Sequence, residues 1–144
     1  MRLAIYEILE QAWEIDDLEE LRAFFQANDS PALRTVLEYA YDKKLEWLLP
    51  YGAPPFKLNE DVEAHGQLYS VVRKLNQFVK SGPYPNLPEY KRQMLFIQFL
   101  ETIHPKDAEL IVKIKDGKFP YRFNPYFLQT TFPGIRIEKL NVED

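Results

Sequence analysis

The sequence has no cysteine and only two histidines, so it offers few ligands for a metal ion or a redox group. Without cysteine, disulfides, cysteine-based zinc sites and thiol nucleophiles are excluded. His65 and His104 belong to neither the H-x-x-x-H nor the H-E-x-x-H spacing that zinc ligands on one helix require. Because His104 directly precedes Pro105, we expect it to start a helix. The sequence therefore predicts no metal site.

Glycine and serine are also scarce. The five glycines lie far apart and form no glycine-rich phosphate loop. None of the three serines belongs to a G-x-S-x-G motif, the usual signature of a serine hydrolase. Carboxylates gather at 14–20, EIDDLEE, where they suit a solvated face and the start of a helix. We therefore expect no catalytic residue, no cofactor and no small-molecule substrate: a protein that is not an enzyme.

Long apolar runs are missing as well. No segment approaches the roughly 20 apolar residues of a membrane span, and the acidic start of the chain is unlike a secretory signal. What is present is an ordinary globular balance, with 46% hydrophobic and 28% charged residues among 144. The lack of cysteine fits a reducing compartment. We expect a soluble, cytoplasmic protein without membrane contacts that forms one domain over residues 1–144.

Apolar residues recur at helical spacing through most of the chain, and polar caps and prolines mark where helices begin. Asp16 or Asp17 caps one helix, and NDSP at 28–31 predicts another, with Ser30 as N-cap and Pro31 in the first turn. We expect the first helix over 2–14 and the second from about 18, with Leu18, Leu21, Phe24 and Phe25 buried. The third helix is expected from 31 to about 49, with a break near Asp42. Further helices are expected over 64–80 and 90–103, from 105 to the KDG triplet at 115–117, and from 125 to a stop at Gly134.

Proline-rich breakers separate these helices. They are LPYGAPPFKLNED at 49–61, which we interpret as an ordered loop over the core, SGPYPNLP at 81–88 and GKFPYRFNP at 117–125. Because the connections are unequal and rich in proline, we expect an all-α single compact domain of about six to seven orthogonally packed helices, not an up-down bundle. The helix at 90–103 is apolar on most faces, which predicts that it lies at the centre. We expect a frayed tail over about 136–144.

Charge is unevenly distributed along the chain, although its net value is only −4. Residues 1–66 carry 6 Lys and Arg against 14 Asp and Glu, a net charge of −8. Residues 67–144 carry 12 against 8, a net charge of +4. The overall acidity argues mildly against a general nucleic-acid binder. The asymmetry allows either an ordinary solvated surface or one acidic and one basic face.

The segment KIKDGKFPYRFNPYF at 113–127 combines four cations with five aromatic residues. Its KDG triplet is similar to K-x-D-G, the nucleotidyl-lysine motif of DNA ligases and capping enzymes, but Ile114 stands where the nucleophilic lysine would lie. The strands that would carry such a site are also missing from the pattern. We interpret KDG as a helix end with Gly117 at the stop, and we expect Phe119, Phe123 and Phe127 to pack into the core.

The order of segments over about residues 5–135 resembles the N-terminal helical DNA-binding domain of the ATP-dependent DNA ligases of T-even bacteriophages. The resemblance lies in NDSPALRTVLEYAYDKKLEWLLP (28–50), LYSVVRKLNQFV (68–79) and FIQFLETIHPKDAELIVKIKDGKFPYRFNPYFLQTTFPGI (96–135). Lys115-Asp116 looks like the start of the ligase R-D-L-x-x-G turn, and FPGI at 132–135 looks like its closing W-P-G-L. The adenylation and OB domains are missing, and the turn lacks the later glycine, so the resemblance implies DNA binding without ligation.

The sequence is more similar still to small standalone proteins of T-even-like phages, including cyanophages. Those proteins share the phrases NDTPALR, WLLPEGAPPYK, PKDAELL and KDKKLPYK. This chain has NDSPALR, WLLPYGAPPFK, PKDAELI and KDGKFPYR. This resemblance implies a phage protein that acts in the host cytoplasm during infection, and it implies no known activity.

The two resemblances predict a non-catalytic phage accessory protein that binds duplex DNA largely through the DNA backbone. Arg73 and Lys80 are seven residues apart and can share a helix face. Tyr121 and Asn124 can reach sugar or groove edges. The candidate nucleic-acid-binding residues are Arg73, Lys74, Lys80, Lys91, Arg92, Lys113, Lys115, Lys118, Tyr121, Arg122 and Asn124.

A second hypothesis is a protein-interaction module, either a regulator or a DNA mimic, that acts on a phage or host replication, repair or transcription protein. EIDDLEE at 14–20 and the loop WLLPYGAPPF at 47–56 are its candidate contacts. A structural virion component is a third alternative that no feature favours. Geometry separates the first two: nine cations on one continuous face favour DNA binding, whereas carboxylates interleaved among them favour a protein partner.

Overall fold

All regular elements in the described part of the chain are helical. The computed structural model describes residues 2–137. The α-helices are α1 (Ile5–Trp13), α2 (Leu18–Ala27), α3 (Pro31–Tyr41), α4 (Gln67–Val71), α5 (Glu89–Thr102), α6 (Pro105–Lys115) and α7 (Pro125–Thr131), and two 3-10 helices, η1 (Val62–Gly66) and η2 (Val72–Phe78), flank α4. Within residues 2–137 there is no strand, and the β-type pairing is one antiparallel bridge between Trp47 and Val79. The prediction of an all-α fold is confirmed.

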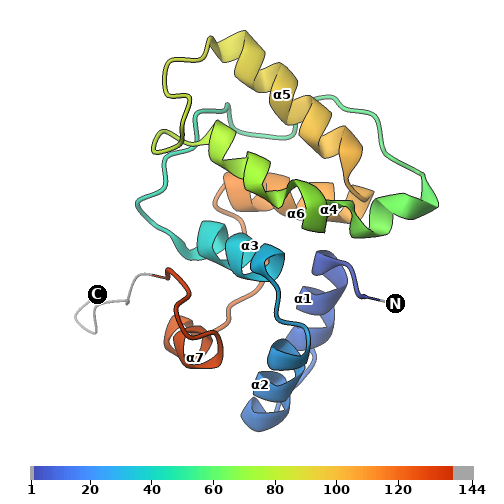
Figure 1. Ribbon diagram of the computed structural model, residues 1–144, viewed down its shortest axis with the longest axis vertical. Helices are drawn as coiled ribbons and strands as arrows, with labels where there is room; N and C mark the ends of the chain where they lie inside the picture. The colour runs from blue at the N-terminus through green and yellow to red at the C-terminus, as the bar shows by residue number, and fades with distance from the viewer. Residues whose placement is uncertain (1, 138–144) are drawn as a thin grey trace.

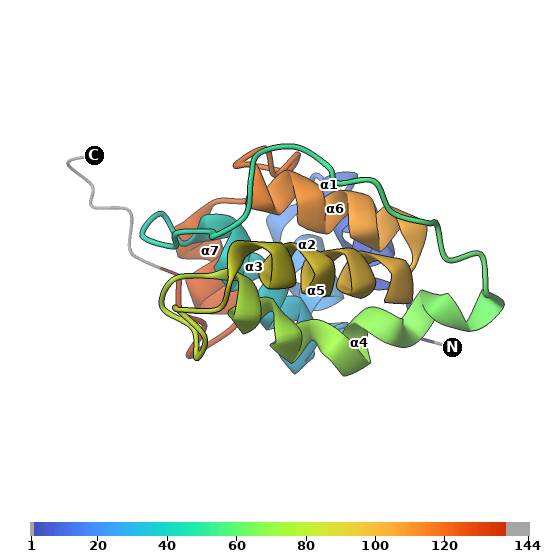
Figure 2. The ribbon, with the colours of Figure 1, turned by 90° about the horizontal axis from the view of Figure 1, so that it is seen from above.

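The helices follow different directions: α5, α6 and the α4–η2 stretch run roughly alongside one another (Figure 2), whereas α1 and α2 run across them (Figure 1). α4, α5 and α6 occupy the upper part of the molecule in this view, and α1, α2 and α7 occupy the lower part. Seen from above, α5 separates the α4–η2 stretch from α6 (Figure 2), and it packs against both. The cations of η2 and those of α6 therefore come from different sides of the molecule.

The central helix is α6, so the expectation that the helix at 90–103 lies at the centre is wrong. α6 packs against α1, α3 and α5, and seven of its eleven residues are buried. α5 buries only four of its fourteen residues. Its large residues Tyr90 and Met94 are 64% and 56% exposed. Their size suggested an inward face, but α5 lies at the edge of the fold and has neighbours on only part of its surface.

Polar caps begin α2, α3 and α6, as the sequence predicts. Asp17 accepts a hydrogen bond from Glu20 N at the start of α2, and Ser30 accepts one from Leu33 N at the start of α3. His104 starts α6, with its Nδ1 accepting from Lys106 N at 3.0 Å. These contacts satisfy backbone donors that have no partner within a helix.

α3 ends at Tyr41 with Asp42 as its C-cap, so the predicted break near Asp42 is confirmed, whereas the predicted continuation of the helix to about Leu49 is wrong. The backbone beyond it pairs across the fold: Leu48 N donates to the Phe78 carbonyl at 2.8 Å, and Lys80 N donates to the Glu46 carbonyl at 2.9 Å. A segment whose amides pair with another segment cannot also make helical hydrogen bonds. Tertiary pairing therefore overrides the helical pattern here.

The predicted helix over 64–80 is instead the series η1, α4 and η2. In η2 the buried residues Val72, Leu75 and Phe78 recur at every third position. That spacing fits the three residues per turn of a 3-10 helix better than the 3.6 of an α-helix.

Two further expectations are corrected by burial. Leu18 was predicted to be buried on α2, but it is 60% exposed because it lies at the helix start, away from the neighbours that cover Leu21 and Phe25. The tail was expected to fray from about 136, but Ile137 is only 5% exposed and its carbonyl accepts a hydrogen bond from Gln129 Nε2. The remainder of that predicted tail, 138–144, lies outside the described residues.

Candidate nucleic-acid interface

The turn after α6 begins with a left-handed glycine. Gly117 has a φ of 72°, a value that suits glycine and ends the helix. Gly117 N donates to the Ile114 carbonyl at 3.1 Å, and Lys118 N donates to the Lys113 carbonyl at 2.7 Å. The interpretation of KDG as a helix stop is confirmed.

The aromatic residues of this turn point inward and anchor it. Phe123 and Phe127 are 6% and 8% exposed, and Phe119 packs against the edge of the core. Phe123 N donates to the Tyr41 hydroxyl at 2.9 Å, and the Tyr41 ring also contacts Phe119. The prediction that the three phenylalanines pack into the core is confirmed. Lys118 and Arg122, which directly precede Phe119 and Phe123, are left on the outside.

Arg92 does not belong to a basic surface, contrary to expectation, because it is only 2% exposed. Its guanidinium donates to the carbonyl of Gln77 at 2.6 Å and to that of Tyr84 at 2.8 Å. Longer contacts reach the carbonyls of Pro85 and Leu87. Arg92 therefore fastens the SGPYPNLP segment to η2 and has no donor face open to a phosphate.

Lys115 is also buried, so the expectation that it contacts DNA from the surface is wrong. Its Nζ donates to the carbonyls of Pro50 and Gly52 at 2.8 and 3.0 Å and to Asp116 Oδ1 at 2.5 Å. Gly52 N donates back to both carboxylate oxygens of Asp116, each at 3.1 Å. The Lys115-Asp116 pair therefore holds another segment in place.

That segment, residues 50–59, crosses over α6 and α5 as an irregular strap (Figure 2). One end is bound by Lys115 and Asp116. The other end is bound on α5, where Lys57 N donates to Glu101 Oε2 and Asn59 Nδ2 donates to the Thr102 carbonyl. A cavity of about 230 Å³ lies between the strap, α5 and α6. It is lined by Leu49, Pro50, Tyr51, Gly52, Ala53, Pro54, Pro55, Gln93, Phe96 and Lys115.

The seven candidate cations that remain exposed or half-exposed fall into two groups. The η2-side cations are Arg73, Lys74, Lys80 and Lys91, and the turn cations are Lys113, Lys118 and Arg122. Arg73, Lys74 and Lys80 belong to η2 or follow it, Lys91 lies on α5, and the turn cations lie at the end of α6 and beyond it, on the other side of α5 in Figure 2. Arg73 and Lys80 do not share a helix face as expected, because η2 ends at Phe78. The nine predicted cations therefore do not form one continuous surface.

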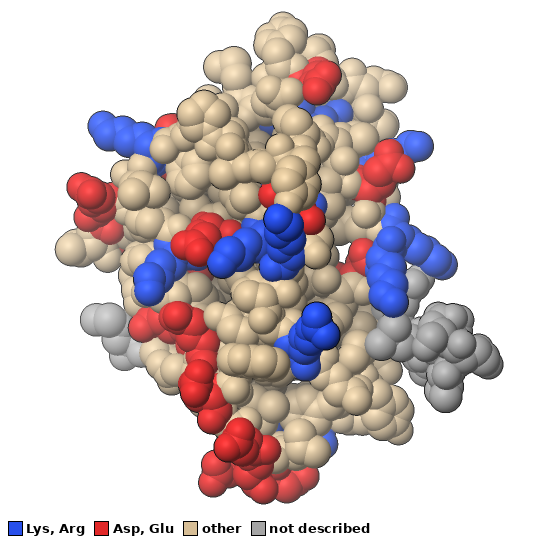
Figure 3. Space-filling model, turned by 180° about the vertical axis from the view of Figure 1, so that it is seen from behind, with Lys and Arg blue, Asp and Glu red and all other residues tan. Residues whose placement is uncertain are grey.

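Carboxylates lie among the turn cations. Glu109 Oε1 is 3.0 Å from Lys113 Nζ, one helical turn away on α6. Both residues line a shallow groove together with Glu10, Lys106 and Tyr121. Seen from behind, the cations form a broken band across the middle of the molecule, and carboxylates gather at the end that α2 occupies (Figure 3). The turn cations therefore form a small basic site within a mixed surface.

Tyr121 and Asn124 are more constrained than the sequence suggested. The Tyr121 ring lies among those of Trp13, Phe119 and Phe123, and burial raises the pKa of its hydroxyl. Asn124 Oδ1 accepts from Tyr126 N at 2.8 Å and so caps α7. Asn124 can present only its amide NH₂ to a ligand without losing the cap.

Tyr51 is not among the residues predicted from the sequence to contact nucleic acid. Tyr51 lies on the strap and is 68% exposed. The ammonium of Lys118 is 5.1 Å from the centre of its ring, and the neighbouring Tyr51 hydroxyl raises the pKa of Lys118. The sequence signal was the aromatic and proline-rich loop itself, but only the fold brings it beside Lys118.

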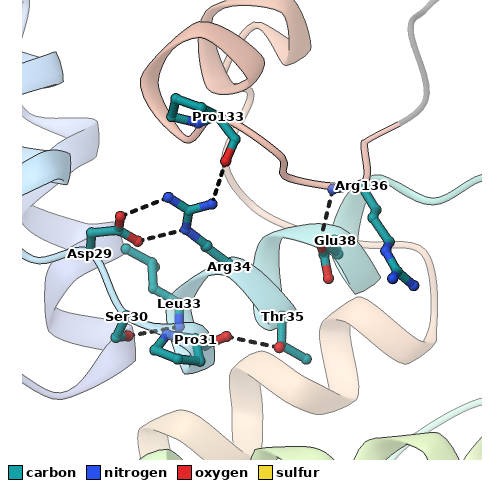
Figure 4. A network of polar contacts seen from close by, with 9 residues as sticks. All are labelled: Asp29, Ser30, Pro31, Leu33, Arg34, Thr35, Glu38, Pro133 and Arg136. Atoms are coloured by element: carbon teal, nitrogen blue, oxygen red, sulfur yellow. Dashed lines mark hydrogen bonds and ion pairs between the residues drawn. The ribbon is translucent and has the colours of Figure 1, made fainter.

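The NDSPALR and FPGI phrases meet in a structural network (Figure 4). Arg34 binds Asp29 through two contacts of 2.8 Å and donates to the Pro133 carbonyl at 2.7 Å. Arg136 N donates to Glu38 Oε2 at 2.8 Å, which holds the chain after Gly134 against α3. The NDSPALR and FPGI phrases therefore specify a tertiary contact and offer no set of free hydrogen-bond donors to a ligand.

Asp107 in the PKDAELI phrase also has a structural role. Its carboxyl group is fully buried, Oδ1 accepts from Tyr6 N at 2.9 Å, and Oδ2 has no hydrogen-bond partner among the described residues. Burial raises the Asp107 pKa to about 7, although the hydrogen bond from Tyr6 opposes the shift. The group joins α6 to α1 and is inaccessible to a ligand.

Within residues 2–137, no group of three or more His, Asp or Glu side chains is arranged to hold a metal ion. The helices in this same part of the chain are too short or too polar to cross a membrane.

Comparison with known proteins yields a family but no activity. No curated protein matches the chain. One family model matches residues 8–120, which include the strap, α5, α6 and the start of the turn. That match covers most of the chain, so the protein belongs to DUF6433, a family of unknown function.

Proposed function

We propose that this protein is a non-catalytic phage accessory protein that binds the backbone of duplex DNA, with a grip like that of the ligase N-terminal domain, in the cytoplasm of the infected host. The observation that carries the proposal is the geometry of the turn after α6. Its phenylalanines are anchored in the core, so the turn cations Lys118 and Arg122 are presented outward on a rigid support.

The number of exposed turn cations sets how strongly the affinity should depend on salt. Three turn cations can neutralise about three phosphates, so the slope of log K against log salt should be about −2.7. Affinity should then fall about 40-fold between about 50 and 200 mM salt. This is a modest grip, in keeping with the net charge of −4 and the carboxylates near the site.

The test is fluorescence anisotropy with a labelled duplex at both salt concentrations. We expect Lys118→Glu combined with Arg122→Glu to weaken binding strongly. The matched control is Arg73→Glu combined with Lys74→Glu, which reverses two exposed cations on the η2 side. No binding at low salt would refute the proposal, and a loss confined to the control variant would place the site on the η2 side.

The second candidate function is binding of a replication, repair or transcription protein through the acidic end of the molecule. Trp13 and Leu18 are 47% and 60% exposed, and in the sequence Trp13 directly precedes EIDDLEE while Leu18 lies within it. Exposed apolar side chains within an acidic surface suit a basic protein partner. Affinity capture from infected cells with wild type and a Trp13→Ala, Leu18→Ser variant would test it, since a real partner should be lost from the variant.

A further inference from the structure

The strap exposes the side chain of Tyr51 to solvent while its backbone is held on both sides of that residue. The residues on either side of Tyr51 are both held: the carbonyls of Pro50 and Gly52 accept from Lys115 Nζ, and Gly52 N donates to Asp116. Tyr51 itself is 68% exposed. The backbone is therefore fastened at this point while most of the side chain is exposed to solvent.

The restraint uses charged groups that are costly to bury. The side chains of Lys115 and Asp116 are only 2% and 8% exposed. Removing an ammonium and a carboxylate from water costs several kcal/mol, which good geometry offsets only in part. A pair of this kind is not needed to bury an apolar side chain, because the residue it positions most directly is exposed.

The surroundings of Tyr51 match the chemistry of an unpaired nucleotide. Lys118 lies over one face of the ring, and the exposed Arg122 follows four residues later in the same turn, so a cation for the backbone lies beside an exposed aromatic side chain. Tyr51 is also one of the residues that line the cavity beneath the strap. Aromatic rings beside cations are the usual platform for stacked single-stranded bases.

We propose that Tyr51 stacks on an unpaired base, so that the site prefers DNA in which a single-stranded stretch adjoins duplex. This inference rests on the proposed DNA binding and names the form of DNA that the same site favours. An intact duplex has no free base face along its length, so it can engage the turn cations but not Tyr51. A junction can engage both.

The test compares three labelled DNAs: a blunt duplex, the same duplex with a five-nucleotide overhang, and that overhang built from abasic nucleotides. The abasic overhang keeps the phosphates and removes the base faces. Stacking contributes about 1–3 kcal/mol per base, so we expect the normal overhang to bind at least about 5-fold more tightly than the abasic one. We expect Tyr51→Phe to keep this preference and Tyr51→Ala to remove it.

Tyr90→Ala is the matched control, because Tyr90 is similarly exposed, at 64%, but lies on α5. It should leave the preference unchanged. Equal affinity for the normal and abasic overhangs, or a preference that survives Tyr51→Ala, would overturn the inference. If all three DNAs bind equally and Lys118→Glu with Arg122→Glu weakens them equally, the inference alone fails. If no DNA binds at low salt, the proposed function fails with it.

Discussion

The buried and the exposed charges of this protein perform opposite tasks. Arg92, Lys115 and Asp107 are almost completely buried, and their polar atoms hold distant segments together. Lys118 and Arg122 are exposed and hold nothing comparable. The position of a cation within a basic stretch of sequence therefore does not show whether its side chain is free to bind a ligand. Lys115 and Lys118 are three residues apart, yet only Lys118 can reach a phosphate.

The largest expected effect is on stability when a buried charge is removed. Arg92→Ala leaves several carbonyls without their donor, and we expect it to lower the free energy of unfolding by about 4 kcal/mol. Arg92→Lys should recover only part of this loss, because an ammonium cannot reproduce the planar fork. Urea unfolding followed by circular dichroism measures both variants. Lys91→Ala, an exposed neighbour, should change stability by less than about 0.5 kcal/mol.

Asp107 should make stability fall as pH rises. Its folded pKa of about 7 lies above the ordinary value of 3.8, so the group stabilises the fold below pH 3.8 and loses that contribution as pH rises through 7. In Asp107→Asn the side chain stays neutral. We expect the stability of the variant relative to wild type to increase by ~3 kcal/mol between about pH 4 and pH 8.

Asp29 supplies the matched control for that experiment, with the opposite sign. The hydrogen bonds from Arg34 lower the Asp29 pKa below 3.8, so its contribution is present above that pH and is lost as pH falls further. Asp29→Asn should therefore cost stability at pH 7 and little in strong acid. A wild-type profile that matched Asp107→Asn at every pH would show that Asp107 does not titrate as its burial indicates.

Reversal of the exposed turn cations should change affinity and leave stability intact. Lys118→Glu with Arg122→Glu should lower duplex affinity by about 30-fold, or ~2 kcal/mol, near 100 mM salt. Its unfolding free energy should stay within about 0.5 kcal/mol of wild type. A large loss of stability would show that these cations, like Lys115, have a structural task, and the contrast between buried and exposed charges would then fail.

Arg34 is intermediate between the buried and the exposed charges, and its substitution should give the smallest change among these predictions. Its side chain is 30% exposed, that of Asp29 is 34% exposed, and the guanidinium also lies over the Phe132 ring. Arg34→Met keeps most of the apolar contact and loses the polar one, so we expect a loss of about 1 kcal/mol in thermal or urea unfolding. Arg136→Met is the control, because that side chain points away from the network (Figure 4).

Local features of the sequence could predict the helix starts and stops. A serine or aspartate before an apolar run, a proline in the first turn and a glycine at the end each act within a few residues. Ser30, Asp17 and Gly117 accordingly have the positions expected of them. The end of α3 and the form of 62–78 were predicted less well, because pairing of residues 46–48 with 78–80 competes with the helix.

The sequence by itself determined the all-α class, the caps, the helix stop at Gly117 and the inward position of the phenylalanines in the turn. Only the tertiary structure decided which cations are free. Lys115 is buried because the Pro50 carbonyl, 65 residues away in the chain, lies within 2.8 Å of its ammonium. The same folding of the strap brings Tyr51 beside Lys118. Burial and partnership of charges depend on segments that are distant in sequence, and no local pattern records them.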